Sequence, residues 1–396
     1  MLSHPSTPPG PPALSATPDH DFALAMRSQL GAGGGNLFFS PFSIRAALGM
    51  ACVGARGATA EQMRSVLHLP ETDETPPTDF GEIIDRIGLA SSVKYEFATA
   101  NSLWSQAGSA IETAFLETMA QDYGCDMQLV DFRNSADAAR RTINHWVENK
   151  TRGRIQQLIH PGGIDNLTRL ILVNAVYFKG LWLQPFLEQE TLDEPFYLER
   201  SRTVRAKLMY QQNSFRYTQA KGYQAVELPY RDSDIAMLVL LPRHKDGLGS
   251  LEQKLSTRML NDCVAQMQRQ EVELFLPRFK LTWGTVELTD VLNELGMKMA
   301  FDRGQADFSG INGLKPPHED ALYISSVLHK AFAEVNEEGT EAAAATAFGM
   351  VGCALNLEPP AIPVFRADHP FLFAIRDRKS GTLLFLGRVA DPTQEN

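Results

Sequence analysis

Apolar residues recur along the chain with two spacings, one typical of strands and one typical of helices. Apolar runs of strand length occur at 170–178, 235–241 and 272–281. Helical spacing is found at 110–123 and 135–150. Two apolar runs, 371–376 and 383–389, flank a turn at 377–381 and predict a C-terminal hairpin. Helix and strand signals are mixed along the chain, which predicts an α+β fold.

Local signals also set the expected boundaries in the N-terminal third. Thr59-Ala-Glu-Gln62 has the spacing of a capping box and predicts a helix that begins near Thr59. The first twenty residues contain six Pro and no charged side chain before Asp19, so residues 1–20 are predicted to form a disordered tail. No linker rich in Pro, Gly or Ser divides the rest, and residues 21–392 are therefore predicted to form a single domain.

Charge and composition argue against several classes of partner. The net charge is -10 and the pI is near 5.5, without a cluster of Lys and Arg among aromatic residues, so nucleic acid is not an expected partner. The apolar runs have the length of strands, so no membrane span is expected. The N-terminus lacks the basic start and the apolar run of a secretory signal, which favours a cytoplasmic or leaderless protein and leaves an extracellular one open.

Cysteine spacing and the search for catalytic motifs point away from an enzyme. The four cysteines, Cys52, Cys125, Cys263 and Cys353, form no C-x-x-C or zinc-like spacing. Free thiols suit a reducing compartment, and two disulfides stay open as an alternative. The chain has no G-x-S-x-G, H-E-x-x-H or phosphate-loop motif, and its histidines show no metal-ligand spacing. We therefore expect no catalytic residue, no metal and no cofactor.

One segment has the properties of a loop that can become a strand. Glu337 and Glu338 are expected to be solvated, Gly339 to be a permissive hinge, and the residues that follow Glu341 are uncharged and mostly Ala or Gly. The Ala run also has high helix propensity, but a helix there would bury nothing large over its first two turns. With a period of two, the even-numbered positions 340–350 are all small or apolar and share one face. Such a face could enter an existing sheet.

This segment resembles the reactive-loop hinge of the serpins, the serine protease inhibitor family. Four further motifs are similar to serpin motifs: NLFFSPFSI at 36–44, followed by a helix ending in GARG at 54–57; NAVYFKGLW at 174–182; HKA at 329–331; and FRADHPFLF at 365–373. The motifs occur in the order of the family and extend over nearly the whole chain. One motif alone would be a weak signal.

The resemblance implies a fold and a mechanism. In the implied fold, helices pack around three β-sheets and an exposed reactive-centre loop spans about 337–363. A serine protease attacks a carbonyl of this loop and forms an acyl-enzyme, and the cleaved loop then inserts into the central sheet as a strand. Fourteen inserted residues at roughly 3.3 Å each would carry the protease on the order of 45 Å. The implied function is irreversible, suicide-substrate inhibition through a covalent 1:1 complex.

The attacked bond follows from the resemblance by counting fourteen residues from Gly339. This gives Cys353 as the attacked residue and Ala354 after it, with Met350 and Phe348 as alternative frames. A small side chain suits the shallow pocket of an elastase-like protease, and the larger apolar alternatives suit a chymotrypsin-like one. Trypsin-like targets are disfavoured because the loop contains no Lys or Arg.

The resemblance also assigns three residue sets. The hinge comprises Glu337, Glu338, Gly339, Thr340, Glu341, Ala342, Ala343, Ala344, Ala345 and Thr346. The shutter, a polar cluster through which the central sheet opens, comprises Ser40, Ser43, Asn174 and His329. The breach, where the loop meets the top of this sheet, comprises Trp182 and Arg278. Arg278 is expected to form a partly exposed ion pair with Glu337, worth about 0 to 1 kcal/mol.

Two other functions stay open. The first is a non-inhibitory serpin that acts as a chaperone or carrier, and the second is a cross-class inhibitor of papain-like cysteine proteases. Small, uncharged residues at 342–345 favour inhibition over the first alternative. Heparin is not expected as a partner because the segment 71–86 is acidic. The inhibitor itself is expected to be a monomer.

Overall fold

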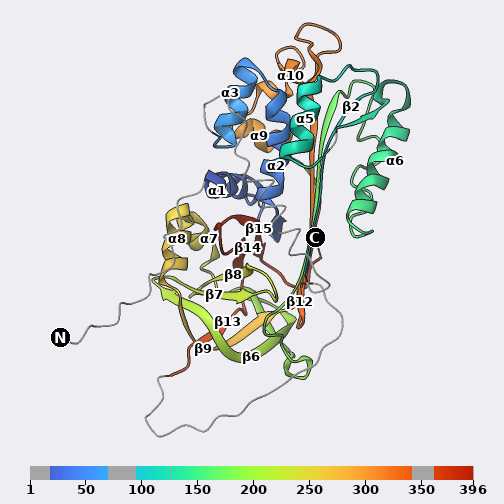
Figure 1. Cartoon of the computed structure of the whole chain (residues 1–396). Coiled ribbons are helices and arrows are strands. Elements are labelled where there is room, and N and C mark those ends of the chain that lie inside the picture. Colours follow the sequence, from blue (N-terminus) through green and yellow to red (C-terminus); the bar gives the residue numbers. More distant parts are fainter. Residues whose placement is uncertain (1–17, 70–94, 126, 341–360, 396) are drawn as a thin grey trace, which may run out of the picture.

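The computed structural model describes residues 18–69, 95–125, 127–340 and 361–395 (Figure 1). Several predicted features fall outside these ranges. They are the tail residues 1–17, the acidic segment 71–86, the hinge residues 341–346 and the residues of the alternative reactive bonds, Phe348, Met350, Cys353 and Ala354.

The helices lie mainly at one end of the molecule. They are α1 (Pro18–Leu30), α2 (Pro41–Gly54), α3 (Gly57–Val66), α5 (Thr113–Asp122), α6 (Phe132–Lys150), α7 (Leu248–Lys254), α8 (Thr257–Gln266), α9 (Thr289–Glu294) and α10 (Ser309–Asn312), with single 3-10 turns η1 (Glu188–Glu190) and η2 (Met299–Phe301). Figure 1 shows α1–α3, α5, α9 and α10 gathered around one end of a long central sheet, with α6 alone on its other side.

The central sheet has six strands and contains the end of the predicted hinge. Its order is β10 (Phe279–Glu287), β11 (Ile324–Val335), β12 (Gly339–Thr340), β4 (Leu170–Leu181), β2 (Tyr95–Gln106) and β3 (Gln128–Val130). Strand β12 separates β11 from β4 at one end only, because these two strands also pair with each other, in parallel, from Ile324 to Phe332.

A second sheet of nine strands fills the other end of the molecule. Its order is β1 (Leu37–Phe39), β15 (Leu383–Val389), β14 (Phe371–Asp377), β8 (Ile235–Pro242), β7 (Tyr223–Pro229), β6 (Arg202–Ala220), β9 (Gln268–Pro277) and β13 (Val364–Arg366), with β5 (Leu192–Glu199) paired to β6. Where the resemblance implies three sheets, the described strands form two hydrogen-bonded sheets. The long strand β6 joins what would be two sheets, because it pairs with β7 near its end and with β5 and β9 along the rest.

The two faces of the central sheet have different neighbours. On the even-numbered face of β4, Val176 and Phe178 pack into the core that this sheet shares with the nine-stranded sheet, and Leu170 and Leu172 pack into the core at the helical end. Odd-numbered side chains, such as Val173 and Ala175, pack with Ile143 of α6. The period-two alternation of the strand thereby directs odd-numbered and even-numbered side chains into separate cores.

Most of the predicted elements are confirmed, with changes at their boundaries. The strands at 170–178 and 235–241 are β4 and β8, the hairpin is formed by β14 and β15, and the helices at 110–123 and 135–150 are α5 and α6. The strand predicted at 272–281 is wrong as a single element, because the chain passes from one sheet to the other at Arg278, between β9 and β10.

Two N-terminal predictions are also corrected. Helix α1 begins at Pro18, so the predicted tail extends three residues too far. Thr59 does not cap a helix, since α3 already begins at Gly57. The Thr59 hydroxyl instead accepts a hydrogen bond of 3.0 Å from the backbone N–H of Asp307, and the side chain is buried. A tertiary contact has taken the place of the local one.

Candidate functional site

The described end of the hinge is already part of the central sheet. Gly339 and Thr340 pair with Leu181 and Gly180 of β4 in antiparallel register. A Cβ atom on Gly339 would lie 2.0 Å from the carbonyl oxygen of Gly180, so only glycine fits there. The φ angle of Gly339 lies outside the left-handed region, so the close approach, and not the backbone conformation, is what requires glycine in this state, and its use as a hinge stays a prediction. Its function in the structure is to permit close approach of two strands.

Thr340 is held by an aromatic pair at the top of the sheet. Its side chain is fully buried, and its hydroxyl lies 2.7 Å from the hydroxyl of Tyr230. The ring of Tyr230 stacks on Trp182, with centroids 4.6 Å apart and planes inclined by 16°. Burial raises the pKa of Tyr230, so this hydroxyl keeps its proton and can donate to Thr340.

Trp182 contacts the hinge through its backbone and its side chain. Its backbone N–H donates to the carbonyl of Glu338 at 2.8 Å, and its indole Nε1 donates to the carbonyl of Asn336 at 3.0 Å. The Oδ1 atom of Asn336 accepts from the N–H groups of Glu338 and Gly339 at 3.1 and 3.2 Å. Asn336 therefore shapes the turn that leads from β11 into β12. Sequence reasoning missed this residue, although Asn is a usual turn residue because its side chain can accept from the backbone N–H two residues further on.

Glu337 is buried, which corrects the prediction that it is solvated. Only 3% of its side chain is exposed, whereas Glu338 is half-buried. The Oε1 atom of Glu337 accepts from Arg278 at 2.6 Å and also accepts from the hydroxyl of Thr191. The expected ion pair with Arg278 is present. Arg278 is 40% exposed and the hydroxyl of Thr191 is a second partner of the carboxylate, so removal of the arginine should cost about 1 kcal/mol, the upper end of the range for exposed pairs.

The shutter residues form one hydrogen-bonded cluster at the middle of the sheet. The Nδ2 atom of Asn174 donates to the hydroxyl of Ser43 at 2.6 Å, and Oδ1 of Asn174 contacts Nδ1 of His329. The backbone N–H of Ser40 donates to Nε2 of His329 at 3.2 Å, and the hydroxyl of Ser40 caps α2 by accepting from the N–H of Ser43. All four side chains are buried. The cluster thereby connects β4, β11 and the N-terminus of α2.

Asn101 of β2 is a fifth member that sequence reasoning missed. Its Oδ1 atom accepts from the hydroxyl of Ser43 at 3.0 Å and also contacts Nδ2 of Asn174. In the sheet, Asn101 is directly opposite Asn174, which is directly opposite His329. One polar row thus crosses three adjacent strands. The local sequence around Asn101 carries no signal for this row, because it depends on the register of strands that are far apart in the chain.

The hydrogen bonds of His329 require a neutral ring. Its Nε2 atom accepts from a backbone N–H, so the proton lies on Nδ1, which donates to Asn174. Complete burial lowers the pKa of His329 to about 3, and the hydrogen bond with Asn174 opposes this shift. A second proton would place two donors, the imidazolium and the N–H of Ser40, against each other.

The described residues form no group of His, Cys, Asp or Glu able to hold a metal ion. The described part of the chain likewise contains no helix that is both long and apolar enough to cross a membrane. Cys52, Cys125 and Cys263 are free thiols. The site consists of a sheet in which β12 separates strands β11 and β4 at one end, while hydrogen-bonded polar side chains connect them at the middle.

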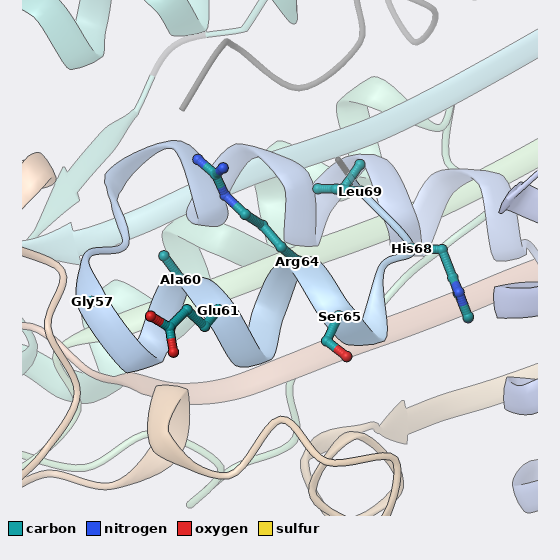
Figure 2. Close-up of a pocket in the computed structure, with 7 residues that line it drawn as sticks. All are labelled: Gly57, Ala60, Glu61, Arg64, Ser65, His68 and Leu69. Carbon is teal, nitrogen blue, oxygen red and sulfur yellow. The ribbon is translucent and has the colours of Figure 1, made fainter. Parts of the chain in front are cut away.

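A cavity of about 870 Å³ lies along α3, at the helical end of the molecule (Figure 2). In Figure 2 the side chains of Glu61 and Arg64 on this helix, and of His68 just after it, point in different directions. They do not converge on one point, so we assign no chemistry to this cavity.

Comparison with known proteins agrees with this arrangement. A family model described as "Serpin (serine protease inhibitor)" matches residues 18–392. The chain is 38% identical to the human leukocyte elastase inhibitor over 368 residues, which cover 90% of this chain and 93% of that protein. It is 38% identical to an uncharacterized serpin-like protein of Thermococcus kodakarensis, over 94% of this chain and 84% of the relative. The structure of uncleaved ovalbumin superposes with a TM-score of 0.84 at 29% identity and covers 96% of this chain and 100% of that one.

Proposed function

Because this chain belongs to the serpin family of serine protease inhibitors, we propose that it is an irreversible suicide-substrate inhibitor of elastase-like or chymotrypsin-like serine endopeptidases. The protease attacks the reactive loop and forms an acyl-enzyme, and the cleaved loop then inserts between β11 and β4 before water can release it. The observation that supports this proposal is β12, a two-residue strand that already lies between those strands. The chain is not itself an enzyme in this mechanism.

The register of β12 predicts where inserted residues would lie. Extending the β12–β4 register from Thr340 places Thr346 opposite Asn174. Extending the β12–β11 register places the same Thr346 opposite His329. Insertion would separate Asn174 from His329, and the hydroxyl of Thr346, which can donate and accept, would take the vacated position. The polar cluster could thus be satisfied both before and after insertion.

The same register sorts the loop side chains between the two faces. Ala342 and Ala344 would face the shared core on the side of Thr340, where small side chains fit. Glu341 would face the side of α6, away from this core. This distribution supports an inserting strand, because the one charged residue of the hinge beyond Gly339 falls on the face away from the main core.

Strand length also supports the reading of the reactive bond. In the extended register Met350 would lie opposite Leu170, where β4 begins. Cys353, three residues further, would lie past the end of the strand, where an attached protease would not collide with the sheet. A Cys at the attacked position suits an elastase-like pocket, and two similar relatives are named leukocyte elastase inhibitors. Met350 and Phe348 are the attacked residues in the chymotrypsin-like alternatives.

The test is a denaturing gel after incubation with elastase, chymotrypsin and trypsin. A stable band at the summed mass of inhibitor and elastase or chymotrypsin is expected, at a 1:1 ratio, and trypsin should form none. Cleavage with release of active protease in every case would contradict the proposal and favour the non-inhibitory alternative. Papain in a fourth lane tests inhibition of cysteine proteases.

A matched pair of variants tests insertion itself. Ala344→Arg would bury an unpaired charge in the core, at several kcal/mol, so the loop should be cut while the protease escapes. Glu341→Arg, on the opposite face, should still form the covalent complex. Ala344 is preferable to Thr340 for this test, because Thr340 is already buried in the native structure and its replacement would disturb the uncleaved protein. Equal complex formation by both variants would rule out strand insertion.

Cleavage of the loop should also raise the melting temperature. Before cleavage β11 and β4 are separated by only two residues, so the central sheet lacks a full strand that the cleaved loop can supply. The measurement is differential scanning calorimetry before and after a single cut between residues 347 and 354. A melting temperature that falls or stays level would show that the loop does not enter the sheet.

The free cysteines support a reducing compartment as the site of action. Cys52 and Cys263 are buried, and burial raises the pKa of both thiols, to about 11 for Cys263. A protein that acts inside the cell fits this state. Mass spectrometry with and without reductant, on protein from its natural cell, would test it.

A further inference from the structure

The two ends of the reactive loop flank one charged area of the surface. On the N-terminal side, η1 lies next to Glu337, since its neighbour Thr191 hydrogen-bonds to that carboxylate. On the C-terminal side, the backbone N–H of Glu273 in β9 donates to the carbonyl of Pro363 at 3.0 Å. Between them, β6 pairs with β9. A protease that holds the loop must come close to this area.

Four carboxylates occupy the area, and we call them the acidic patch: Glu188, Glu190, Glu271 and Glu273. Glu188, Glu190 and Glu271 are exposed, and Glu273 is half-buried. Tyr210 of β6 connects the two sides of the patch. Strand β6, which carries Tyr210, pairs with β9 and also contacts η1. Burial raises the pKa of Tyr210, and the negative charges of Glu273 and Glu190 raise it further.

Positive charge in the area does not neutralise the patch. Arg278 lies 2.6 Å from the buried carboxylate of Glu337 but 3.9 Å from that of Glu188. Its positive charge is therefore compensated mainly by Glu337. Arg269 lies on the same strand as Glu271 and donates to the hydroxyl of Ser214. Within the described ranges, no ion pair involves Glu190, Glu271 or Glu273. The area therefore keeps a net negative charge.

An aromatic platform lies beside these carboxylates. The rings of Tyr210 and Phe275 are 4.8 Å apart on paired strands, and the guanidinium of Arg366 lies 4.4 Å from the centre of Phe275. Arg366 is itself paired with Glu194. The side chains of Tyr210, Phe275 and Arg366 are half-buried. Rigid aromatic side chains surrounded by charged groups are typical of surfaces that bind other proteins.

We propose that the acidic patch and the Tyr210–Phe275 platform form a docking surface for the target protease, and that this protease has basic residues around its active-site cleft. The inference rests on the proposed inhibitory function. A protease–inhibitor interface buries roughly 800 Å² on each partner, more than a single extended loop offers, so surface next to the loop must be covered. The acidic patch and the platform lie between the two ends of the loop, so a protease bound to the loop would cover them.

The physical effect of the patch is on the rate of encounter. Opposite charges steer two proteins toward each other and raise the association rate constant, with a strong dependence on salt. Insertion follows encounter and depends on the sheet. The acidic patch should therefore control how fast the protease is inhibited and leave unchanged how many inhibitor molecules are consumed per protease.

The test compares two charge-reversed variants that carry the same net charge. The first, Glu190→Lys with Glu271→Lys, changes the patch. The control, Glu61→Lys with Glu117→Lys, changes two exposed carboxylates on α3 and α5 at the helical end. Association rate constants are measured with leukocyte elastase and with chymotrypsin at 50 mM and 500 mM NaCl, together with the stoichiometry of inhibition and the melting temperature of each variant.

For the protease that forms the covalent complex, the patch variant should associate on the order of tenfold more slowly than wild type at low salt. The difference should nearly vanish at high salt, and the control should stay within about twofold of wild type. Equal slowing by both variants, or no slowing by either, would overturn the docking surface. The proposed function would be unaffected by that result, because it depends only on formation of the covalent complex. A faster patch variant would also overturn the docking surface, because the protease would then be acidic. If wild type forms no complex with either protease, the proposed function fails and the docking surface fails with it.

Discussion

Strands β11 and β4 are held together differently at the breach and at the shutter. At the breach, Thr340 lies between them and contacts Tyr230, which stacks on Trp182. At the shutter the strands pair directly, and His329 contacts Asn174 across the join. The breach thus shows how a loop residue fits between the strands. In the proposed mechanism, the contacts at the shutter must be exchanged before further loop residues can follow. A polar contact can be re-formed with a new partner, so we propose that the shutter acts as a reversible closure.

The largest expected effect is that of Asn174→Ala at the shutter. This change removes hydrogen bonds to His329, Ser43 and Asn101 at once and leaves buried polar atoms unpaired. The free energy of unfolding should fall by about 3 to 5 kcal/mol. Urea unfolding measures it, with the exposed Thr142→Ala as control, which should change stability by less than about 0.5 kcal/mol. A loss below about 1 kcal/mol would show that the shutter contributes little to holding the sheet closed.

A smaller effect is expected from pH, again at the shutter. The pKa of His329 is about 3 in the folded protein and 6.5 in the unfolded chain, so between these values the unfolded state binds the extra proton. Stability attributable to His329 is complete above pH 6.5 and decreases as pH falls below it, by about 2 kcal/mol at pH 5. In His329→Gln, the difference in unfolding free energy between pH 7 and pH 5 should be smaller than in wild type by this amount. Identical pH profiles would contradict the buried neutral ring.

At the breach, a double-mutant cycle separates a lost hydrogen bond from an unpaired hydroxyl. Tyr230→Phe leaves the buried hydroxyl of Thr340 without its partner and should cost about 1 to 2 kcal/mol. Tyr230→Phe combined with Thr340→Val removes both polar groups and should recover most of that loss. The measurement is equilibrium unfolding of both single variants and the double variant. Additive losses would mean that the two hydroxyls do not interact.

The smallest of the four effects is expected for Arg278→Gln. Glu337 would lose its cationic partner but keep the hydroxyl of Thr191, and the arginine is 40% exposed, so about 1 kcal/mol should be lost. Loosening of Glu337 should also release β12 and make the hinge more open to a second molecule. Size-exclusion chromatography after prolonged warming should therefore show more polymer than in wild type, and Lys280→Gln, next to it at the start of β10, serves as control. Equal polymer formation in both variants would show that the ion pair between Arg278 and Glu337 does not hold the hinge in place.

Much of the fold and part of the site could be predicted from the sequence. Strands 170–178 and 235–241 and the C-terminal hairpin follow from local apolar runs, because strands that are buried on both faces need such runs. The pairing of Arg278 with Glu337 and the set of Ser40, Ser43, Asn174 and His329 came from the family resemblance. The structure brings those four residues together, although their function in sheet opening stays a prediction.

Other properties were decided only by tertiary structure. From the sequence, Glu337 is expected to be a solvated loop residue, yet its carboxylate is buried against Arg278. Thr59 is expected to cap a helix, yet its hydroxyl accepts a hydrogen bond from the backbone N–H of Asp307. Asn101 lies in a segment that the sequence analysis did not single out, and only strand register places it opposite Asn174. Gly339 is expected to be a flexible hinge, and in this state the carbonyl of a distant strand also excludes any Cβ there. Periodicity and propensity are local properties that neighbouring residues determine. Burial, hydrogen-bond partners and close approach depend on segments that are far away in the chain, from 59 residues for Arg278 and Glu337 to 248 for Thr59 and Asp307, and whose positions exist only once the sheets have formed.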